Sequence, residues 1–295
     1  MYAVSVSDYF STFCSNLRMN NTTTSTIQYR YKQITKRINT EYWGTASETS
    51  HSLYVGSYGR GTEIWTSDID MIVQLPDKIY ERFNSYQVNG QSALLQDIKN
   101  KLQKTYSISR LKGDGQVIAI EFSDGISFEI VPAFINNDGS YKYPDTNGGG
   151  SWRTTDPRSE ISAINTRNSA TNKNLKRLCR MARAWKSTNN VPMSGILIDT
   201  LVYKFIDNWP HKDKSFLYYD FMSRDFFEFL KNIDKDQLYW LAPGSNRYVW
   251  KYGNFQAKAS IAYNLSLEAI EHETNNRPYS AKQKWREIYG TKFSN

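Results

Sequence analysis

The sequence predicts a two-lobed α/β (α+β) fold in which a small mixed sheet is backed by a helical C-terminal lobe. Two observations lead to this prediction. Up to residue 135, short apolar runs are bounded by turn residues, as in strands. After about residue 160, apolar residues recur mainly at helical spacing. We therefore expect a first lobe over residues 1–158 and a helical lobe over residues 159–295, with a cleft between them.

The first lobe is expected to begin with two helices and then to form its sheet. The Thr/Ser run at 22–25 is suited to cap the second helix. A strong turn signal at 123–125 predicts a hairpin, and Pro132, which cannot donate a ladder hydrogen bond, is expected to end its second strand. The expected helices cover residues 4–18, 23–40, 58–65 and 91–104, and the expected strands cover residues 52–55, 68–73, 117–122 and 126–131.

The boundary between the lobes is expected in residues 136–158, a segment rich in Asn, Gly, Asp and Pro that is typical of a long surface loop. Beyond it, the clearest helix covers residues 172–186, because its apolar side chains fall on one face. Further helices are expected over residues 194–208, 223–233 and 255–272.

Composition narrows the class of protein. A net charge of +8 over 295 residues favours anionic partners such as nucleotides or nucleic acid. Two cysteines and three scattered histidines give little support to a disulfide framework, a zinc site or a Ser-His-Asp triad. No apolar run approaches about 20 residues and no signal peptide is recognisable, so we expect a cytoplasmic protein without membrane contact.

The most informative residues are Gly56-Ser57 and the pair Asp68 and Asp70 that opens an apolar strand. Side chains two residues apart in a strand share a face, with Cα atoms about 6.5–7 Å apart. Two such carboxylates repel each other unless a divalent cation lies between them, and Mg²⁺ binds through one or two carboxylates plus substrate phosphates. Gly56 lets backbone amides approach a phosphate, and Ser57 adds a hydroxyl donor. The run predicts a metal site with a phosphate cradle, rather than an exposed Asp pair after a turn.

A third carboxylate is expected from the hairpin, since two-metal phosphoryl transfer commonly needs one. Glu129 lies between apolar neighbours in its strand and therefore points to the opposite face from them. Asp124 is better explained by the turn, and Glu121 by a solvated strand face.

With these residues the chain resembles the Pol-β-like nucleotidyltransferase superfamily. Within it, the chain is similar to the bacterial cyclic-oligonucleotide synthases, the CD-NTase family, relatives of cyclic GMP-AMP synthase and 2′-5′ oligoadenylate synthase. The first matching segment is shared by the superfamily, and the other two narrow the likeness to the synthase branch. The segments are Gly56-Ser57 with Asp68–Asp70, the strand 129–133, and the helix 175–185 with residues 190–195 after it.

The resemblance implies a metal-dependent enzyme that joins NTPs (ATP, GTP, UTP or CTP) into a cyclic di- or trinucleotide and releases pyrophosphate. Asp68, Asp70 and Glu129 would be the catalytic and metal-binding residues for two Mg²⁺ or Mn²⁺ ions. By the same resemblance, Arg183 contacts the donor triphosphate and Ser194 meets the nucleotide. A solvated charge is the alternative for Arg183, and a helix cap is the alternative for Ser194.

The resemblance also implies a role in bacterial anti-phage signalling (CBASS). There the product activates a separately encoded effector, nucleic acid is not required, and the synthase is a monomer or a loose oligomer. Two rivals stay open. One is a nucleotidyltransferase acting on RNA ends, a small molecule or a protein. The other is a catalytically silent nucleic-acid sensor of the same fold.

Two departures from the family pattern are visible. Glu129 stands where Asp is common, and Ala242-Pro243 replaces a frequent Asp-Pro before the late nucleotide loop. The second departure weakens any assignment of base contacts in residues 243–254. For Tyr248 and Trp250 in this loop, we expect core packing rather than base stacking.

Overall fold

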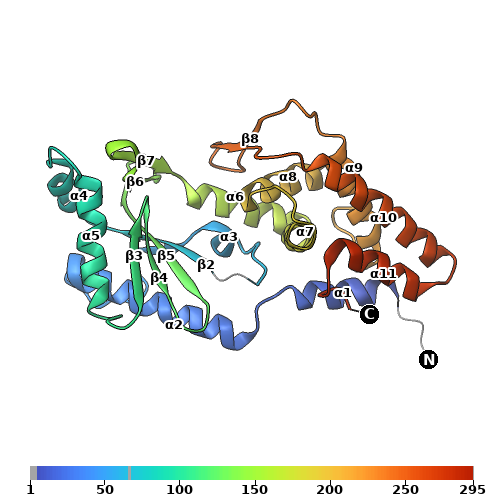
Figure 1. Cartoon of the computed structure of the whole chain (residues 1–295), viewed down its shortest axis with the longest axis horizontal. Coiled ribbons are helices and arrows are strands. Elements are labelled where there is room, and N and C mark those ends of the chain that lie inside the picture. The colour runs from blue at the N-terminus through green and yellow to red at the C-terminus, as the bar shows by residue number, and fades with distance from the viewer. Residues whose placement is uncertain (1–4, 66–67, 295) are drawn as a thin grey trace. The chain divides into compact units, whose positions relative to one another are not determined.

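The computed structural model describes residues 5–65 and 68–294, which form two compact units (Figure 1). Within the described residues, the sheet unit comprises 20–60 and 68–158, and the helical unit comprises 5–19, 61–65 and 159–294. This division differs from the predicted lobes in two segments, because the first helix and residues 61–65 pack with the helical unit.

The sheet unit is built on a mixed sheet in which β2 and β5 run parallel and the other neighbours run antiparallel. The strand order is β1-β2-β5-β4-β3, and β6 joins β5 and then β7. The strands are β1 (Ser52–Tyr54), β2 (Asp68–Gln74), β3 (Arg110–Asp114), β4 (Val117–Glu121), β5 (Ser127–Ile135), β6 (Tyr141–Asp145) and β7 (Ser151–Thr155).

Helices cover the apolar face of this sheet. Thr35 of α2 (Asn21–Ile38) hydrogen-bonds Ser52 of β1. Ser52 is paired with Val73 of β2, so the two residues lie on the same face of the sheet. In α5 (Gly90–Gln103), four buried apolar residues point inward, and this helix lies beside β3 and β4 (Figure 1). The remaining helical elements of the unit are α3 (Gly56–Arg60), α4 (Asp77–Asn84), the π-helical turn η1 (Asn39–Trp43) and the 3₁₀ turn η2 (Asn147–Gly149).

Three local predictions for this unit are wrong. Asn20, not the Thr/Ser run, caps α2 by accepting from the Thr23 amide. The helix expected over 58–65 instead begins at Gly56 and ends at Arg60. Pro132 does not end β5, because β4 pairs with β5 only as far as Ile130, so the missing N–H costs no ladder bond there.

The predicted loop 136–158 is also wrong, since it contains the antiparallel pair β6–β7. Its Asn and Gly residues form the turns before, between and beside two short strands, so composition alone exaggerated its irregularity. The sequence patterns also did not predict the helix α4 or the strand β3.

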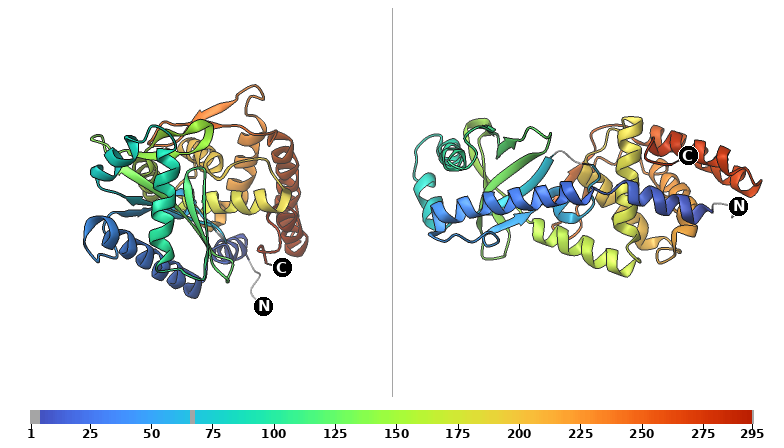
Figure 2. Two further views of the ribbon diagram at one scale, coloured as in Figure 1. Left: turned by 60° about the vertical axis from the view of Figure 1, so that its left-hand side comes forward. Right: turned by 90° about the horizontal axis from the view of Figure 1, so that it is seen from below.

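The helical unit packs its helices around a large aromatic and aliphatic core. α10 contacts both α9 and α11. Figure 2 shows this C-terminal part of the chain, coloured orange to red, from two further directions. The elements are α1 (Val6–Asn16), α6 (Pro157–Ala170), α7 (Asn174–Asn189), α8 (Gly195–Asn208), η3 (Phe216–Tyr218), α9 (Tyr219–Lys231), β8 (Tyr239–Leu241), β9 (Tyr248–Trp250), α10 (Gln256–Thr274) and α11 (Pro278–Tyr289).

The helix α1 belongs to this unit for a hydrophobic reason. Phe10 lies edge-on to Trp285 at 5.2 Å between ring centroids and to Phe293 at 5.3 Å, and all three are fully buried. Burying a large aromatic side chain contributes roughly 1.5–3 kcal/mol, which ties α1 to the end of the chain. Among the described helices, none is both long and apolar enough to cross a membrane.

Candidate active site

The parallel register of β2 and β5 brings the predicted acids to one face of the sheet. Asp70 lies directly beside Glu129, and Asp68 lies directly beside Ser127, which is two residues before Glu129. The alternating residues Ile69 and Phe128 are fully buried on the opposite face. The apolar face therefore fixes the direction of the acids, because a shift of one residue would bury them in the core.

The carboxylates of Asp70 and Glu129 contact each other through a hydrogen bond. Burial raises the pKa of Asp70, and the nearby positive charge of Arg60 offsets only part of that increase. Burial also raises the pKa of Glu129, and repulsion from Asp70 and then from Asp68 raises it further. Each of the two carboxyl groups therefore holds its proton more tightly than an ordinary acid of its type.

Gly56 lies against this pair. Its φ of +60° is left-handed, and a Cβ at this position would stand 1.8 Å from Oδ2 of Asp70. Both the backbone conformation and the close approach require glycine. The amide of Val55 donates to the carbonyl of Asp70 at 2.9 Å, and Ser57 follows in the first turn of α3. The predicted phosphate cradle and the predicted metal ligands are thus brought together within the sheet unit.

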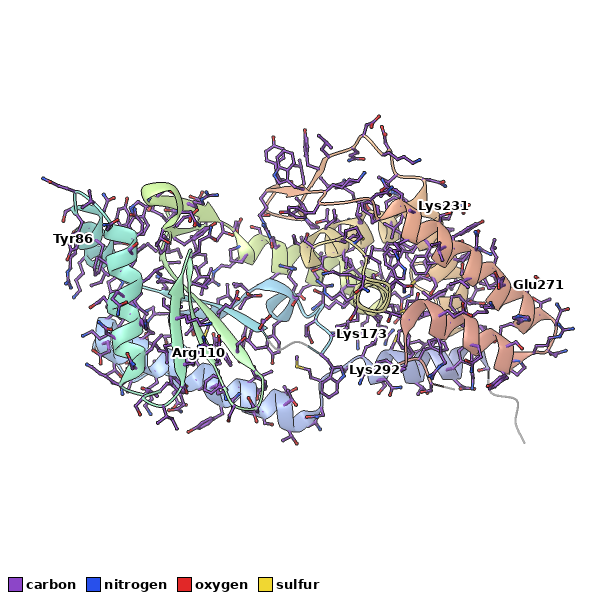
Figure 3. The ribbon with its side chains drawn as sticks, viewed as in Figure 1. Tyr86, Arg110, Lys173, Lys231, Glu271 and Lys292 are labelled. Carbon is purple, nitrogen blue, oxygen red and sulfur yellow. The ribbon has the colours of Figure 1, made fainter. Side chains whose placement is uncertain are left out.

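The competing acids are placed differently. Glu121 shares the face of Glu129, because it pairs with Ser127 in the antiparallel β4–β5 register. Its carboxylate is held by Lys112 at 3.0 Å and by Arg110 of β3 at 3.6 Å. Arg110 is labelled beside the strands of the sheet in Figure 3. Asp124 lies in the hairpin turn, as predicted, and forms two hydrogen bonds with Arg30. Both competing carboxylates are therefore neutralised by the protein itself.

Asp68 makes its own contact at the end of the acid row. Its Oδ1 accepts a hydrogen bond of 2.6 Å from the hydroxyl of Ser127. Among the described side chains, no three Asp, Glu, His or Cys residues converge on one point where a metal ion could bind. The chemistry of the donors nevertheless fits a hard divalent cation, because two carboxylates face each other beside a glycine whose lack of a side chain lets Asp70 lie against the backbone.

Arg183 and Ser194 lie in the helical unit. Arg183 is 8% exposed and forms a two-pronged ion pair with Asp199, at 2.5 and 2.9 Å, so the alternative of a solvated charge is wrong. The hydroxyl of Ser194 accepts from the Leu197 amide at 3.2 Å, which confirms the alternative that it caps a helix. Contact of either residue with a nucleotide stays a prediction.

Two residues near the acids were missed by the sequence analysis. Arg60 is 5% exposed, and its positive charge acts on Asp70. A single basic residue in a short Gly-rich helix gave no indication in the sequence that it would lie near the acids. Ser127 could have been found, because the same alternation that selects Glu129 places residue 127 on the acid face.

The expectation that Tyr248 and Trp250 pack in the core is wrong. They are 58% and 49% exposed and cluster with Tyr239 on the outer face of the β8–β9 hairpin, whose opposite face buries Trp240 and Val249. Alternation along β9 places its aromatic residues outside and its valine inside.

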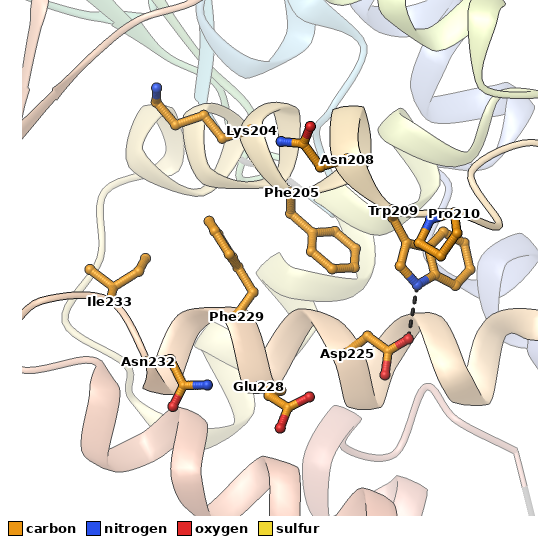
Figure 4. A pocket seen from close by; sticks show the side chains of 10 residues that line it. All are labelled: Lys204, Phe205, Asn208, Trp209, Pro210, Asp225, Glu228, Phe229, Asn232 and Ile233. Atoms are coloured by element: carbon orange, nitrogen blue, oxygen red, sulfur yellow. Dashed lines mark hydrogen bonds between the residues drawn. The ribbon is translucent and has the colours of Figure 1, made fainter.

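Two cavities of about 570 and 750 Å³ lie in the helical unit. The smaller is walled by the rings of Phe205, Phe229 and Trp209, with the Trp209 indole donating to Asp225 at 2.9 Å (Figure 4). Of the described residues, none in the predicted site lines either cavity. The pairing of acids on β2 and β5 is therefore the better candidate for the chemistry.

This arrangement defines a class of enzyme, because paired carboxylates beside a Gly-Ser turn on a mixed sheet are the parts of a nucleotidyltransferase site. The model of the Second Messenger Oligonucleotide or Dinucleotide Synthetase domain matches residues 4–168, more than half of the chain. The chain therefore belongs to this family, the CD-NTases, and is a nucleotidyltransferase of the cyclic-oligonucleotide synthase type.

Several proteins of known name or known structure are similar to this chain. A Bacillus cereus (strain VD146) protein named as a probable cyclic nucleotide synthase is 24% identical over 255 residues, covering 80% of this chain and 74% of that protein. Escherichia coli MS115-1 CdnC, solved with ATP, superimposes with a TM-score of 0.69 at 16% identity over 98% of this chain and 99% of its own. Bradyrhizobium diazoefficiens CdnG, solved with GTP, gives 0.68 at 11% identity, over 99% and 96% of the two chains. These structural likenesses establish the fold.

Proposed function

We propose that this chain joins NTPs into a cyclic di- or trinucleotide, with release of pyrophosphate, and that the product is a second messenger in bacterial anti-phage defence. The observation that carries the proposal is the contact between Asp70 and Glu129, with Gly56 against them. ATP, GTP, UTP and CTP are the candidate substrates, and we expect a cytoplasmic enzyme because NTPs are plentiful there. A separately encoded effector would respond to the product.

The chain's own residues would divide the work between phosphate and metal. Asp68, Asp70 and Glu129 would hold two Mg²⁺ or Mn²⁺ ions, which when bound polarise the α-phosphate and acidify the attacking ribose hydroxyl. Asp68 would join the other two by giving up its hydrogen bond with Ser127. The lack of a side chain at Gly56 lets the carboxylate of Asp70 lie against the backbone of the cradle, and Ser57 would offer its hydroxyl to phosphate oxygens.

Glu129 is also placed to take part in proton movement. Its pKa is raised by burial and by the neighbouring carboxylates, so it retains a proton at a higher pH than an ordinary glutamate. Cation binding would favour its ionised form, and Glu129 could then accept the proton of the ribose hydroxyl. Contacts of Arg183 and Ser194 with the nucleotide are implied only by the family resemblance.

Incubation of the protein with mixed labelled NTPs and Mg²⁺ or Mn²⁺ tests this function. We expect small nucleotide products that resist phosphatase, because a ring has no terminal phosphate, together with released pyrophosphate. Parallel reactions with each NTP omitted would identify the bases. Turnover that requires an added RNA primer and lengthens it would instead establish the RNA-end rival, and a complete lack of turnover would favour the silent sensor.

A further inference from the structure

Residues 61–65 join α3 to β2 along the chain, so the phosphate cradle precedes them and the acid strand follows them. Although α3 and β2 belong to the sheet unit, this connecting segment packs in the helical unit. Gly61 opens it with a left-handed φ of +65°, and a Cβ there would stand 2.9 Å from Nζ of Lys176. The left-handed backbone therefore favours glycine at this position, and the flexible end of Lys176 lies against it.

The first anchor of the segment is a buried hydrogen bond. The hydroxyl of Thr62 donates to Oδ2 of Asp199 on α8 at 2.9 Å, and both residues are 0% exposed. Asp199 is held in turn by Arg183 of α7, through Oδ1 at 2.5 Å and Oδ2 at 2.9 Å. A hydrogen bond to a buried, ion-paired carboxylate is among the stronger kinds that a hydroxyl can make.

The second anchor is Arg180, one helical turn before Arg183. Its Nη2 donates to the carbonyl of Gly61 at 2.7 Å, and its Nε donates to the carbonyl of Glu63 at 3.1 Å. Arg180 thus holds the segment on both sides of Thr62. We call Arg180, Arg183 and Asp199 the 61–65 clamp.

The geometry also shows how Arg183 is engaged. Its Nη1 donates to Asp199 and to the carbonyl of Cys179, and its Nη2 donates to Asp199 and to the carbonyl of Gly195. These bonds involve both terminal nitrogens of the guanidinium, which carry four of its five N–H groups. Such an arrangement serves to orient Asp199 rather than to leave a fork open for phosphate.

We propose that the 61–65 clamp positions the catalytic residues by fixing the chain between the phosphate cradle and Asp68. The proposal rests on the proposed nucleotidyl transfer, because its consequence is a correct placement of Gly56-Ser57 and Asp68 for that reaction. Asp199, Arg183 and Arg180 are then positioning residues, which act on the nucleotide through the segment and not by touching it. Displacement of a catalytic group by about 1 Å can cost about 100-fold in rate.

Thr62→Val is the test, because it removes one hydroxyl while preserving shape and leaves the Arg183–Asp199 pair intact. We expect kcat to fall about 10- to 100-fold while KM for NTP changes less than about threefold. Thr62→Ser should restore most of kcat, since it restores the donor. The matched control is Thr200→Val. Thr200 follows Asp199 in α8, and its fully buried hydroxyl has no hydrogen-bond partner among the described residues. The kcat of this control should equal that of the wild type.

Amide hydrogen exchange gives a readout that does not depend on activity. In Thr62→Val the peptide that contains residues 61–65 should exchange faster, while peptides from the centre of α8 should be unchanged. A wild-type kcat, unchanged exchange over 61–65, or equal losses in Thr62→Val and Thr200→Val would each overturn the clamp. If the wild type makes no nucleotide product, the proposed function fails, whereas the exchange comparison still decides whether the segment is held as described.

A direct phosphate role for Arg183 predicts a different pattern. Arg183→Lys would then raise KM for NTP, with Thr62→Val close to the wild type in kcat. That result would overturn the positioning role and return Arg183 to the set of nucleotide contacts.

Discussion

Asp70 in the sheet unit is half-buried and Asp199 in the helical unit is fully buried, and their surroundings differ. Asp199 faces the guanidinium of Arg183 in a two-pronged ion pair and also accepts from Thr62. Asp70 faces another carboxylate, Glu129, and burial raises its pKa despite the charge of Arg60. In the helical unit, Arg183 neutralises Asp199. In the sheet unit, Asp70 lies beside Glu129, and the positive charge of Arg60 offsets only part of the rise in the pKa of Asp70.

We propose that this difference separates a structural carboxylate from a functional one. A buried ion pair with good geometry is complete without any ligand, and breaking it by removing one partner is strongly destabilising. A carboxylate pair with raised pKa values is stable only with a proton or a cation, and such groups occur frequently at catalytic sites. The acids of β2 and β5 therefore lie where a metal ion would improve the stability of the folded protein.

The largest expected effect is the loss of activity in Asp70→Asn. Removing this proposed metal ligand should lower the rate of nucleotide incorporation by at least about 100-fold. Without metal, the melting temperature should stay the same or rise, because the variant no longer carries a buried charge beside Glu129. Pyrophosphate release and thermal unfolding measure the two effects. A wild-type rate, or a strongly lowered melting temperature, would place Asp70 in the same structural class as Asp199.

The second prediction contrasts two acids on the same face. Glu129→Gln should be nearly inactive, whereas Glu121→Gln should stay within about twofold of the wild-type rate, because Glu121 is an exposed partner of Lys112 and Arg110 and exposed ion pairs contribute little. Steady-state kinetics on both variants would show the contrast. The reverse pattern would transfer the third-ligand role to Glu121.

The third prediction concerns the glycine beside Asp70. Gly56→Ala and Gly44→Ala should both lose about 1–2 kcal/mol for placing alanine at positive φ. A Cβ added at Gly44 would meet no described atom within 4 Å, whereas a Cβ added at Gly56 would displace Asp70. Only Gly56→Ala should therefore lose activity and additional stability. Denaturant unfolding and turnover of the two variants measure this. Equal stability and equal activity would show that the close approach to Asp70 is unimportant.

The smallest expected effect concerns Asp220. It lies in the same unit as Asp199, but its pKa is raised like that of Asp70. Burial raises its pKa to about 6, and hydrogen bonds from the backbone amides of Phe221 and of Asp220 itself only partly offset this. Because the folded pKa exceeds the unfolded value of about 3.9, the free energy of unfolding should fall by about 2–3 kcal/mol as pH rises from 4 past 6.

Asp220→Asn should remove this part of the pH dependence and should therefore be more stable than the wild type at pH 7 but not at pH 4. Thermal unfolding at both pH values provides the measurement. A variant with the same pH dependence as the wild type would mean that burial does not raise the pKa of Asp220 in the folded protein.

The sequence by itself predicted those features that depend on neighbours along the chain. The apolar periodicity of residues 172–186 predicted α7 closely, and the turn at 123–125 predicted the β4–β5 hairpin. Alternation in β5 was enough to separate Glu129 from Phe128 and Ile130. These predictions succeed because a local pattern of burial is sufficient to set the direction of each side chain.

Only the tertiary structure decided which residues meet. The neighbours of Asp70 come from β5 and from the first residue of α3, and the partners of Thr62 and Arg183 come from α8. Strand register and ion pairing between distant segments depend on how whole elements pack, and no short stretch of sequence encodes that. The sequence therefore determined which residues carry charge and on which face they lie. Packing decided that Asp70 would face another acid while Arg183 would face Asp199.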